Sequence, residues 1–243
     1  MRRVAHVAAV ALLVLVDCRQ PARFSGLGVA TSQQFHGGIR FEHLAIGAVD
    51  PVAPLVIALH GRGSSPEGFD GVWRDMPWPL EIALPQAFER YRFGWQWFDW
   101  PHGMTDEDFA TAVSAAEEKL WPALLEAAHG RKLIVTGHSQ GAVIAYVMAA
   151  RHPEIVEVFP VAGGAPHRLM PRHAPTAPVY ALHGDQDDRV SMQWARNTID
   201  DLRAAGGSAE LLEFPGAGHG ITLEMQRDLF AHVAQAAGAM KDR

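Results

Sequence analysis

The chain has 243 residues, of which 48% are hydrophobic and 20% are charged, a composition ordinary for one packed globular domain. Its 21 basic and 27 acidic residues give a net charge of −6, and no basic stripe is visible, so we expect no nucleic-acid partner. The single cysteine, Cys18, excludes a disulfide framework or a thiolate metal cluster within this chain.

The amino end differs in kind from the rest of the chain. Arg2 and Arg3 are followed by residues 4–16, in which only His6 is polar. A basic start and an apolar segment of this length are typical of a secretory signal, and the segment is short for a membrane span. We therefore expect residues 1–17 to be a signal segment and the protein to be periplasmic or secreted. The alternative is a cytoplasmic protein whose apolar start is a buried strand or helix.

Cys18 adds a second version of the export hypothesis. Residues 15–18 resemble a bacterial lipoprotein cleavage box, except that Asp17 stands where the pattern has a small residue. Cleavage there would leave Cys18 at the amino end, with acyl chains that tether the protein to a membrane face. In either version we expect residues 18–37 to be a linker and residues 38–243 to form one folded domain.

Short apolar runs alternate with helical patterns from residue 38 onward. The runs are bounded by Gly, Pro or charged residues, and most are apolar on both sides, which suits strands buried between two helix layers. We therefore predict an α/β fold with a mostly parallel central sheet and helices on both of its faces. The expected strands are 38–46, 55–59, 82–84, 133–136, 156–161, 179–182 and 211–214.

Four helices are expected between these strands. The first begins at Thr105, which can form a capping pair with Asp108, and Pro122 should kink this helix or end it near its last turn. The other three are expected over 142–150, 192–205 and 223–237. Because the functional site of such a sheet lies at the carboxyl ends of its strands, catalytic residues are expected in the loops that follow them.

Residues 137–141 (Gly-His-Ser-Gln-Gly) directly follow one predicted strand and directly precede a predicted helix. In this context G-x-S-x-G indicates a nucleophile turn, in which a serine hydroxyl stands at the edge of the sheet. Glycines are needed two positions to either side, because side chains there would clash in so tight a turn. An ordinary glycine-rich turn is the alternative, and the flanking pattern favours Ser139 as a nucleophile.

A serine hydroxyl needs a base to take its proton, and a histidine should follow later in the chain. His219 lies in a short glycine-rich loop after the last predicted strand. An acidic partner should come from the loop after the preceding strand, where Asp185, Asp187 and Asp188 compete. The residues alone do not choose among these three. The order serine, aspartate, histidine is that of α/β-hydrolases.

Five short motifs stand in order along the chain: 59–63 (Leu-His-Gly-Arg-Gly), 97–99 (Trp-Phe-Asp), 137–141, 183–187 (His-Gly-Asp-Gln-Asp) and 218–220 (Gly-His-Gly). With these motifs the chain resembles, from about Phe41 onward, the phospholipase/carboxylesterase family of α/β-hydrolases, which includes acyl-protein thioesterases. The resemblance implies Asp187 as the acid and the main-chain N–H groups of Arg62 and Gln140 as oxyanion donors. The family often has Leu at the position of Arg62, which leaves the polarity of the pocket open.

The resemblance implies a serine hydrolase that cleaves carboxylic esters through an acyl-enzyme on Ser139, with thioesters and lysophospholipid-type esters as further candidate substrates. An exported acyltransferase or a polyester depolymerase would use the same three residues, and the sequence does not separate these activities. A non-enzymatic binding protein is disfavoured because it would leave the three loops without a role. The expected partner is a small-molecule ester. No cofactor or metal is expected, since H-E-x-x-H and similar ligand spacings do not occur.

Aromatic residues concentrate between positions 93 and 100. Trp95, Trp97 and Phe98 are expected to form an apolar wall for an acyl or aromatic group, since ligand pockets are lined in this way. Packing in the core, with an indole N–H at the surface, is the alternative that the sequence leaves open.

Overall fold

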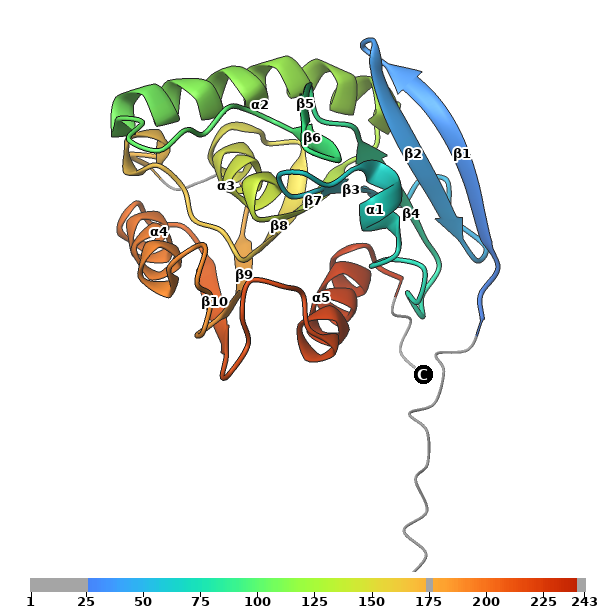
Figure 1. The fold of residues 1–243 in the computed structure, drawn as a ribbon. Coiled ribbons are helices and arrows are strands. Elements are labelled where there is room, and N and C mark those ends of the chain that lie inside the picture. Colours follow the sequence, from blue (N-terminus) through green and yellow to red (C-terminus); the bar gives the residue numbers. More distant parts are fainter. Residues whose placement is uncertain (1–25, 174–176, 240–243) are drawn as a thin grey trace, which may run out of the picture.

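The computed structural model describes residues 26–173 and 177–239, and Figure 1 shows their arrangement. Its centre is an eight-stranded sheet in the order β1-β2-β4-β3-β7-β8-β9-β10. The pairs β1–β2 and β2–β4 are antiparallel, and all other neighbouring pairs are parallel, which confirms the predicted mostly parallel sheet. Its strands are β1 (Val29–His36), β2 (Ile39–Ile46), β3 (Leu55–Leu59), β4 (Leu80–Pro85), β7 (Leu133–His138), β8 (Ile155–Val161), β9 (Val179–Gly184) and β10 (Ala209–Phe214).

Helices cover both faces of this sheet, with α2 and α3 on one side and α5 on the other (Figure 1). A separate hairpin pairs β5 (Glu89–Tyr91) with β6 (Gly94–Gln96). Within the described ranges, no helix combines the length and the apolar character that a membrane crossing needs. The helices are α1 (Pro66–Asp70), α2 (Asp106–Ala128), α3 (Gln140–Arg151), α4 (Met192–Ala204) and α5 (Leu223–Ala236), with the 3₁₀ turn η1 (His167–Leu169).

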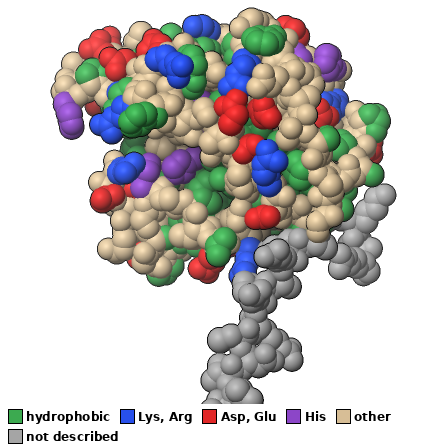
Figure 2. Space-filling model, turned by 45° about the vertical axis from the view of Figure 1, so that its right-hand side comes forward, with side chains coloured by type: hydrophobic (Ala, Val, Ile, Leu, Met, Phe, Trp, Pro, Cys, Tyr) green, Lys and Arg blue, Asp and Glu red, His purple; other side chains and the backbone are tan. Residues whose placement is uncertain are grey.

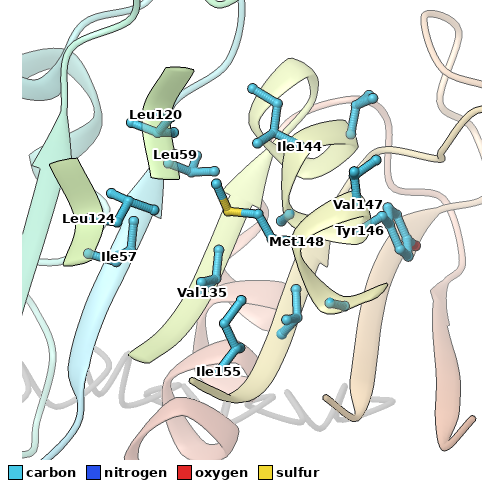
Figure 3. Packing of buried hydrophobic residues seen from close by; sticks show 14 of the residues in the cluster. Ile57, Leu59, Leu120, Leu124, Val135, Ile144, Tyr146, Val147, Met148 and Ile155 are labelled. Carbon is cyan, nitrogen blue, oxygen red and sulfur yellow. The ribbon is translucent and has the colours of Figure 1, made fainter. Parts of the chain in front are cut away.

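Alternation along β3 divides the core into two clusters, one on each face of the sheet. Ile57 and Leu59 pack in the cluster with α2 and α3, and Figure 3 shows Ile57 beside Leu124 and Leu59 beside Leu120 of α2. Val56 and Ala58 belong to the opposite cluster, which contains α5. Both sets of side chains are fully buried, which explains why the strand is apolar at every position. Burial of each large aliphatic side chain contributes about 1.5–3 kcal/mol.

The predicted linker 18–37 is wrong over most of its described part. Val29–His36 forms β1, which pairs with β2 along its whole length. Most of its side chains are exposed, so backbone hydrogen bonds rather than an apolar pattern hold it at the sheet edge. The predicted signal segment 1–17 and Cys18 lie outside the described residues, and export and lipidation therefore stay predictions.

Helix α2 begins where the sequence predicts and ends later. Thr105 is its N-cap, and the Thr105 hydroxyl oxygen accepts the N–H of Asp108 at 3.1 Å. The helix passes through Pro122 and ends at Ala128. Leu124 is fully buried beyond the proline, so packing of this last turn against the core outweighs the backbone hydrogen bond that proline removes.

Charged side chains of both signs are interspersed on the face shown in Figure 2. This face carries no broad patch of a single charge.

Candidate active site

Four loops meet around Ser139 at one edge of the sheet. They follow β3, β7, β9 and β10, and because these strands run in the same direction, their carboxyl ends lie at the same edge. The sequence places its candidate nucleophile, acid, base and oxyanion donors in these loops, and the structure brings them together.

Ser139 lies at the sharp turn between β7 and α3. Its backbone has a φ of 55° and a ψ of −116°, a conformation that is strained for a residue with a side chain. Both flanking glycines are required by close packing. A Cβ on Gly137 would lie 2.4 Å from the carbonyl carbon of Gly141, and one on Gly141 would lie 2.2 Å from the carbonyl oxygen of Leu59. The turn thus has the tight geometry that the motif predicts for a nucleophile turn.

The side chains of Ser139, His219 and Asp187 form a continuous hydrogen-bonded row. His219 Nε2 lies 3.0 Å from Ser139 Oγ, and His219 Nδ1 lies 2.8 Å from Asp187 Oδ2. A carboxylate can only accept, so Nδ1 carries the proton of the neutral ring and Nε2 is left to accept the serine hydroxyl proton. The arrangement can therefore deprotonate Ser139.

Asp187 is held as a carboxylate by several donors. Its Oδ1 accepts the N–H groups of Arg189 and Val190, each at 2.9 Å, and His183 Nε2 lies 3.3 Å from Oδ2. Burial of the side chain acts to raise the pKa of Asp187, but the N–H of Val190, the His219 ring and the N–H of Arg189 outweigh it and hold this pKa below its usual value. The group that faces His219 is therefore charged at neutral pH.

The two competing aspartates point elsewhere. Asp185 Oδ1 accepts the N–H of Gly216 at 2.7 Å, which ties the Asp185 loop to the loop that carries His219. Asp188 is exposed. Of the three aspartates that the sequence left open, Asp187 is the one in contact with the imidazole.

Two main-chain N–H groups are available beside the serine. Gly61 packs close to the turn, since a Cβ on it would lie 3.4 Å from Ser139 Cβ. Gln140 begins α3, where first-turn N–H groups have no partner within the helix. Among the described residues, the N–H groups of Arg62 and Gln140 donate to no protein acceptor. Both can therefore bind an anionic oxygen, which the positive end of the helix dipole also favours.

Buried side chains hold these donors in place, a role that the sequence analysis did not assign to them. The side chain of Gln140 accepts the N–H of Trp97 at 3.1 Å and donates to the carbonyl of Phe98 at 2.8 Å. The indole N–H of Trp97 donates to the carbonyl of His60 at 2.7 Å. The segment 97–98 thus bridges the loop after β3 and the start of α3. In the sequence, the position of residues 97–99 among the five ordered motifs was the signal that this segment lies near the site.

His138 links the serine turn to the histidine loop. Its Nε2–H donates to the carbonyl of His219 at 2.8 Å, across 81 residues of sequence. Burial lowers the pKa of His138 to about 4, and the pKa of the fully buried His60 also to about 4. Both rings are therefore neutral hydrogen-bonding groups at neutral pH.

These two histidines make folding sensitive to mild acid. An unfolded chain protonates histidine below its ordinary pKa of 6.5, whereas folded His60 and His138 resist protonation down to about 4. The free energy of unfolding should therefore have its maximum above pH 6.5 and decrease as the pH falls to 4, by up to about 3 kcal/mol for each ring. Urea unfolding at pH 7 and pH 4.5 measures the loss. The control His60→Gln cannot titrate, so an equal loss in this variant would contradict the prediction for His60.

The carboxyl-terminal part of the chain matches a known protein family. The family model of the dienelactone hydrolase family covers residues 102–242, more than half of the chain. The chain belongs to the dienelactone hydrolase family. The match includes the segments that carry Ser139, Asp187 and His219.

Individual relatives agree with the α/β-hydrolase resemblance. Esterase LipC of Mycobacterium tuberculosis is 36% identical over 74 residues, which are 30% of this chain and 17% of LipC. The chain spans less than half the length of the curated relatives it matches. The crystal structure of esterase PE8 has a TM-score of 0.69 at 22% identity, covering 86% of this chain and 99% of PE8. Acyl-protein thioesterase 2 of Zea mays has a TM-score of 0.61 at 18% identity, covering 82% and 99%. These structures show that the fold is that of the α/β-hydrolases.

In this member of the dienelactone hydrolase family, a cavity of about 600 Å³ opens above the serine. Arg62, Arg92 and Arg189 contribute to its walls, so the cavity is partly cationic. Within residues 26–173 and 177–239, no group of three or more His, Cys, Asp or Glu side chains is placed to hold a metal ion. The other residues that line the cavity above Ser139 are Gly61, Gly63, Ser64, Phe69, Tyr91, Phe93, Trp100, His138, Ser139, Gln140, Val190 and His219.

The predicted pocket wall of Trp95, Trp97 and Phe98 is wrong, because none of the three lines this cavity. Trp97 and Phe98 are only 2% and 4% exposed and belong to the core. Trp97 lies inside because its indole N–H has a buried carbonyl partner. Trp95 stacks against Arg90, whose guanidinium carbon lies 4.5 Å from the ring centre.

The side chain of Arg62 fixes one wall of the cavity. Its guanidinium donates to the Gln96 side chain at 3.0 Å and to the carbonyl of Trp100 at 3.1 Å. It also lies 4.0 Å from the centre of the Tyr91 ring and 3.5 Å from Asp99 Oδ1. Arg62, where the phospholipase/carboxylesterase family often has Leu, thus connects the loop after β3 to Trp100.

Proposed function

We propose that this protein is a serine hydrolase of carboxylic esters. The observation that carries the proposal is the row of Asp187, His219 and Ser139, with contacts of 2.8 and 3.0 Å, inside a cavity large enough for a small ester. Its membership of the dienelactone hydrolase family supports the same class of reaction. Thioesters would react by the same route.

In the proposed mechanism, Ser139 Oγ attacks the ester carbonyl carbon while His219 Nε2 takes the hydroxyl proton. The carbonyl oxygen becomes an anion, which the N–H groups of Arg62 and Gln140 stabilise. Loss of one such donor typically raises the barrier by about 3–4 kcal/mol. Asp187 keeps the His219 ring in the tautomer that can accept a proton and stabilises the imidazolium that forms.

The tetrahedral intermediate then collapses. The bond to the alcohol oxygen breaks, and His219 gives its proton to the departing alcohol, which leaves an acyl group on Ser139. A water molecule gives a proton to the same histidine and attacks the acyl carbon. In the second intermediate the bond between the acyl carbon and Ser139 Oγ breaks, His219 returns the proton to Oγ, and the acid is released.

Labelling with a fluorophosphonate tests the proposal directly. A serine activated by His219 should displace fluoride and yield one phosphonyl adduct per chain, and peptide mass analysis should place it on Ser139. The control variant His219→Ala should label far more slowly. An adduct on another residue, or no turnover of any ester in a panel of esters and thioesters, would overturn the assignment.

A further inference from the structure

The β5–β6 hairpin packs directly on the loop after β3, the loop that presents the Arg62 N–H. The two segments form a short β-bridge, in which the N–H of Gly63 donates to the carbonyl of Trp95 at 2.7 Å and the N–H of Trp95 donates to the carbonyl of Ser64 at 2.8 Å. Their backbones are also in close contact at Gly94, because a Cβ on this residue would lie 2.3 Å from the carbonyl oxygen of Ser64. The hairpin therefore fixes the two residues that follow Arg62.

The side chain of Arg62 adds further connections to the hairpin and to the segment after it. Its Nε–H donates to Gln96 Oε1 at 3.0 Å, its Nη1 donates to the carbonyl of Trp100 at 3.1 Å, and its Nη2 lies 3.5 Å from Asp99 Oδ1. The Tyr91 ring lies against the guanidinium, with 4.0 Å between the ring centre and the guanidinium carbon. Each of the three guanidinium nitrogens thus has a protein partner, and the group is part of the cavity wall.

The acceptor of the Arg62 Nε–H is itself held in place. Gln96 is only 6% exposed, and its amide nitrogen donates to Glu89 Oε2 at 3.1 Å, between paired positions of β6 and β5. Because the amide nitrogen is bonded to Glu89, the amide oxygen is turned toward Arg62. The two hydrogen bonds together select one orientation of the Gln96 amide and one position of the guanidinium.

The need for these contacts follows from the residues beside the donor. Gly61 and Gly63 flank Arg62, and Gly63 has a φ of 81°. Glycine restricts its backbone less than any other residue, so this loop does not fix the direction of the Arg62 N–H by itself. An oxyanion donor must lie about 2.7–3.1 Å from the place of the oxygen, and an error of about 1 Å in the position of a catalytic group costs about 10² in rate.

We propose that the side chain of Arg62 positions its own main-chain N–H by binding the β5–β6 hairpin. This inference rests on the proposed ester hydrolysis and assigns the side chain that aligns one oxyanion donor. Any substitution of Arg62 other than proline keeps the N–H, so the effect of the side chain can be measured separately from the presence of the donor.

Arg62→Leu is the first test, because it removes the contacts with Gln96, Trp100 and the Tyr91 ring. We expect kcat for the best ester to fall about 10–100-fold with KM within about threefold, since the donor matters more in the transition state than in the bound ester. An alkylboronic acid gives a second readout. Ser139 Oγ adds to its boron and the hydroxyl proton passes to His219, which gives an anionic tetrahedral adduct that resembles the transition state. Its Ki should rise by a similar factor.

Two further variants separate alignment from charge. Arg62→Lys keeps the positive charge but lacks the planar fork that reaches Gln96 and Trp100 together, so its kcat should stay within about threefold of that of Arg62→Leu. Gln96→Leu leaves Arg62 unchanged and removes the acceptor of its Nε–H. It should lower kcat about 3–10-fold, and the double variant should lose no more than Arg62→Leu alone, because both substitutions break one contact. Thermal unfolding scans check that each variant is folded, and Gln96→Leu carries the test if Arg62→Leu is not.

Arg90→Leu is the matched control. Arg90 is an exposed arginine of the same hairpin, where it stacks on Trp95, and within the described part of the chain it does not line the cavity. It should keep kcat and Ki within about twofold of the wild-type values.

Four outcomes would overturn the inference. They are a rise of KM at constant kcat in Arg62→Leu, wild-type kcat in Arg62→Lys, unchanged kcat in Gln96→Leu, and an equal loss in Arg90→Leu. Each of them leaves wild-type turnover dependent on Ser139, whereas failure of the proposed function would remove that dependence.

Discussion

Ester turnover by Ser139→Ala should fall by about 10⁶ in kcat, because the triad acts as a unit and loss of its nucleophile leaves only binding and oxyanion effects. The protein should remain folded. The Ser139 hydroxyl contacts the His219 side chain, and its removal breaks no backbone hydrogen bond. Steady-state kinetics on the best ester and a thermal unfolding scan measure the two quantities.

Ser64→Ala provides the matched control for this experiment. Ser64 lines the same cavity and also carries a hydroxyl, but this hydroxyl lies near the carbonyl of Ser65 and makes no contact with His219. Its loss should change kcat by no more than a few-fold. Substantial turnover in purified Ser139→Ala, or an equal loss in Ser64→Ala, would exclude Ser139 as the nucleophile.

The position of Ser139 could be predicted from the sequence because its determinants are local. The turn needs glycine at two fixed positions, and the structure shows why: a Cβ at Gly137 or Gly141 would lie within 2.4 Å of neighbouring backbone atoms. The N-cap at Thr105 is local in the same way, since one hydroxyl bonds an N–H three residues later. Both features depend on residues that lie within a few positions of one another, so the sequence alone can predict them.

The choice of acid depends on side-chain directions that spacing does not contain. Asp185, Asp187 and Asp188 share one loop, and only the folded backbone decides which carboxylate faces His219. In the structure Oδ1 of Asp187 is fixed by the N–H groups of Arg189 and Val190, which leaves Oδ2 for the ring. The family resemblance chose the same residue on the strength of its motif.

The pocket prediction failed for a related reason. The sequence shows that aromatic residues concentrate between positions 93 and 100. Large aromatic rings are common both in protein cores and in ligand cavities, so the sequence does not say which of the two a given ring occupies. The indole N–H of Trp97 donates to the buried carbonyl of His60, so this ring lies in the core. Trp100, in contrast, contributes to the walls of two cavities, one of them the cavity above Ser139. The sequence analysis did not predict the edge strand Val29–His36, because its backbone pairing to β2 needs no apolar side chains and so leaves no apolar pattern in the sequence.

Asp187→Asn should lower kcat by about 10⁴ while leaving the fold nearly intact. The oxygen of the introduced amide would keep the two N–H donors of Arg189 and Val190, which hold the present Oδ1 at 2.9 Å. The amide nitrogen would then face His219 Nδ1 and donate to it. The ring would have to carry its proton on Nε2, the atom that must accept the proton of Ser139. The base would thus be blocked by its tautomer rather than removed, and kcat measured across the neutral pH range should stay low throughout.

Asp185→Asn tests whether the effect belongs to the carboxylate that faces the ring. Asp185 Oδ1 accepts the N–H of Gly216, and an asparagine oxygen can accept the same hydrogen bond. Its kcat should therefore stay within about tenfold of the wild-type value, although the substitution lies in the same loop and removes the same charge. A large loss in Asp185→Asn with a small one in Asp187→Asn would reverse the assignment of the acid. Comparable losses in both would mean that loop charge matters, and that the tautomer of His219 does not decide the rate.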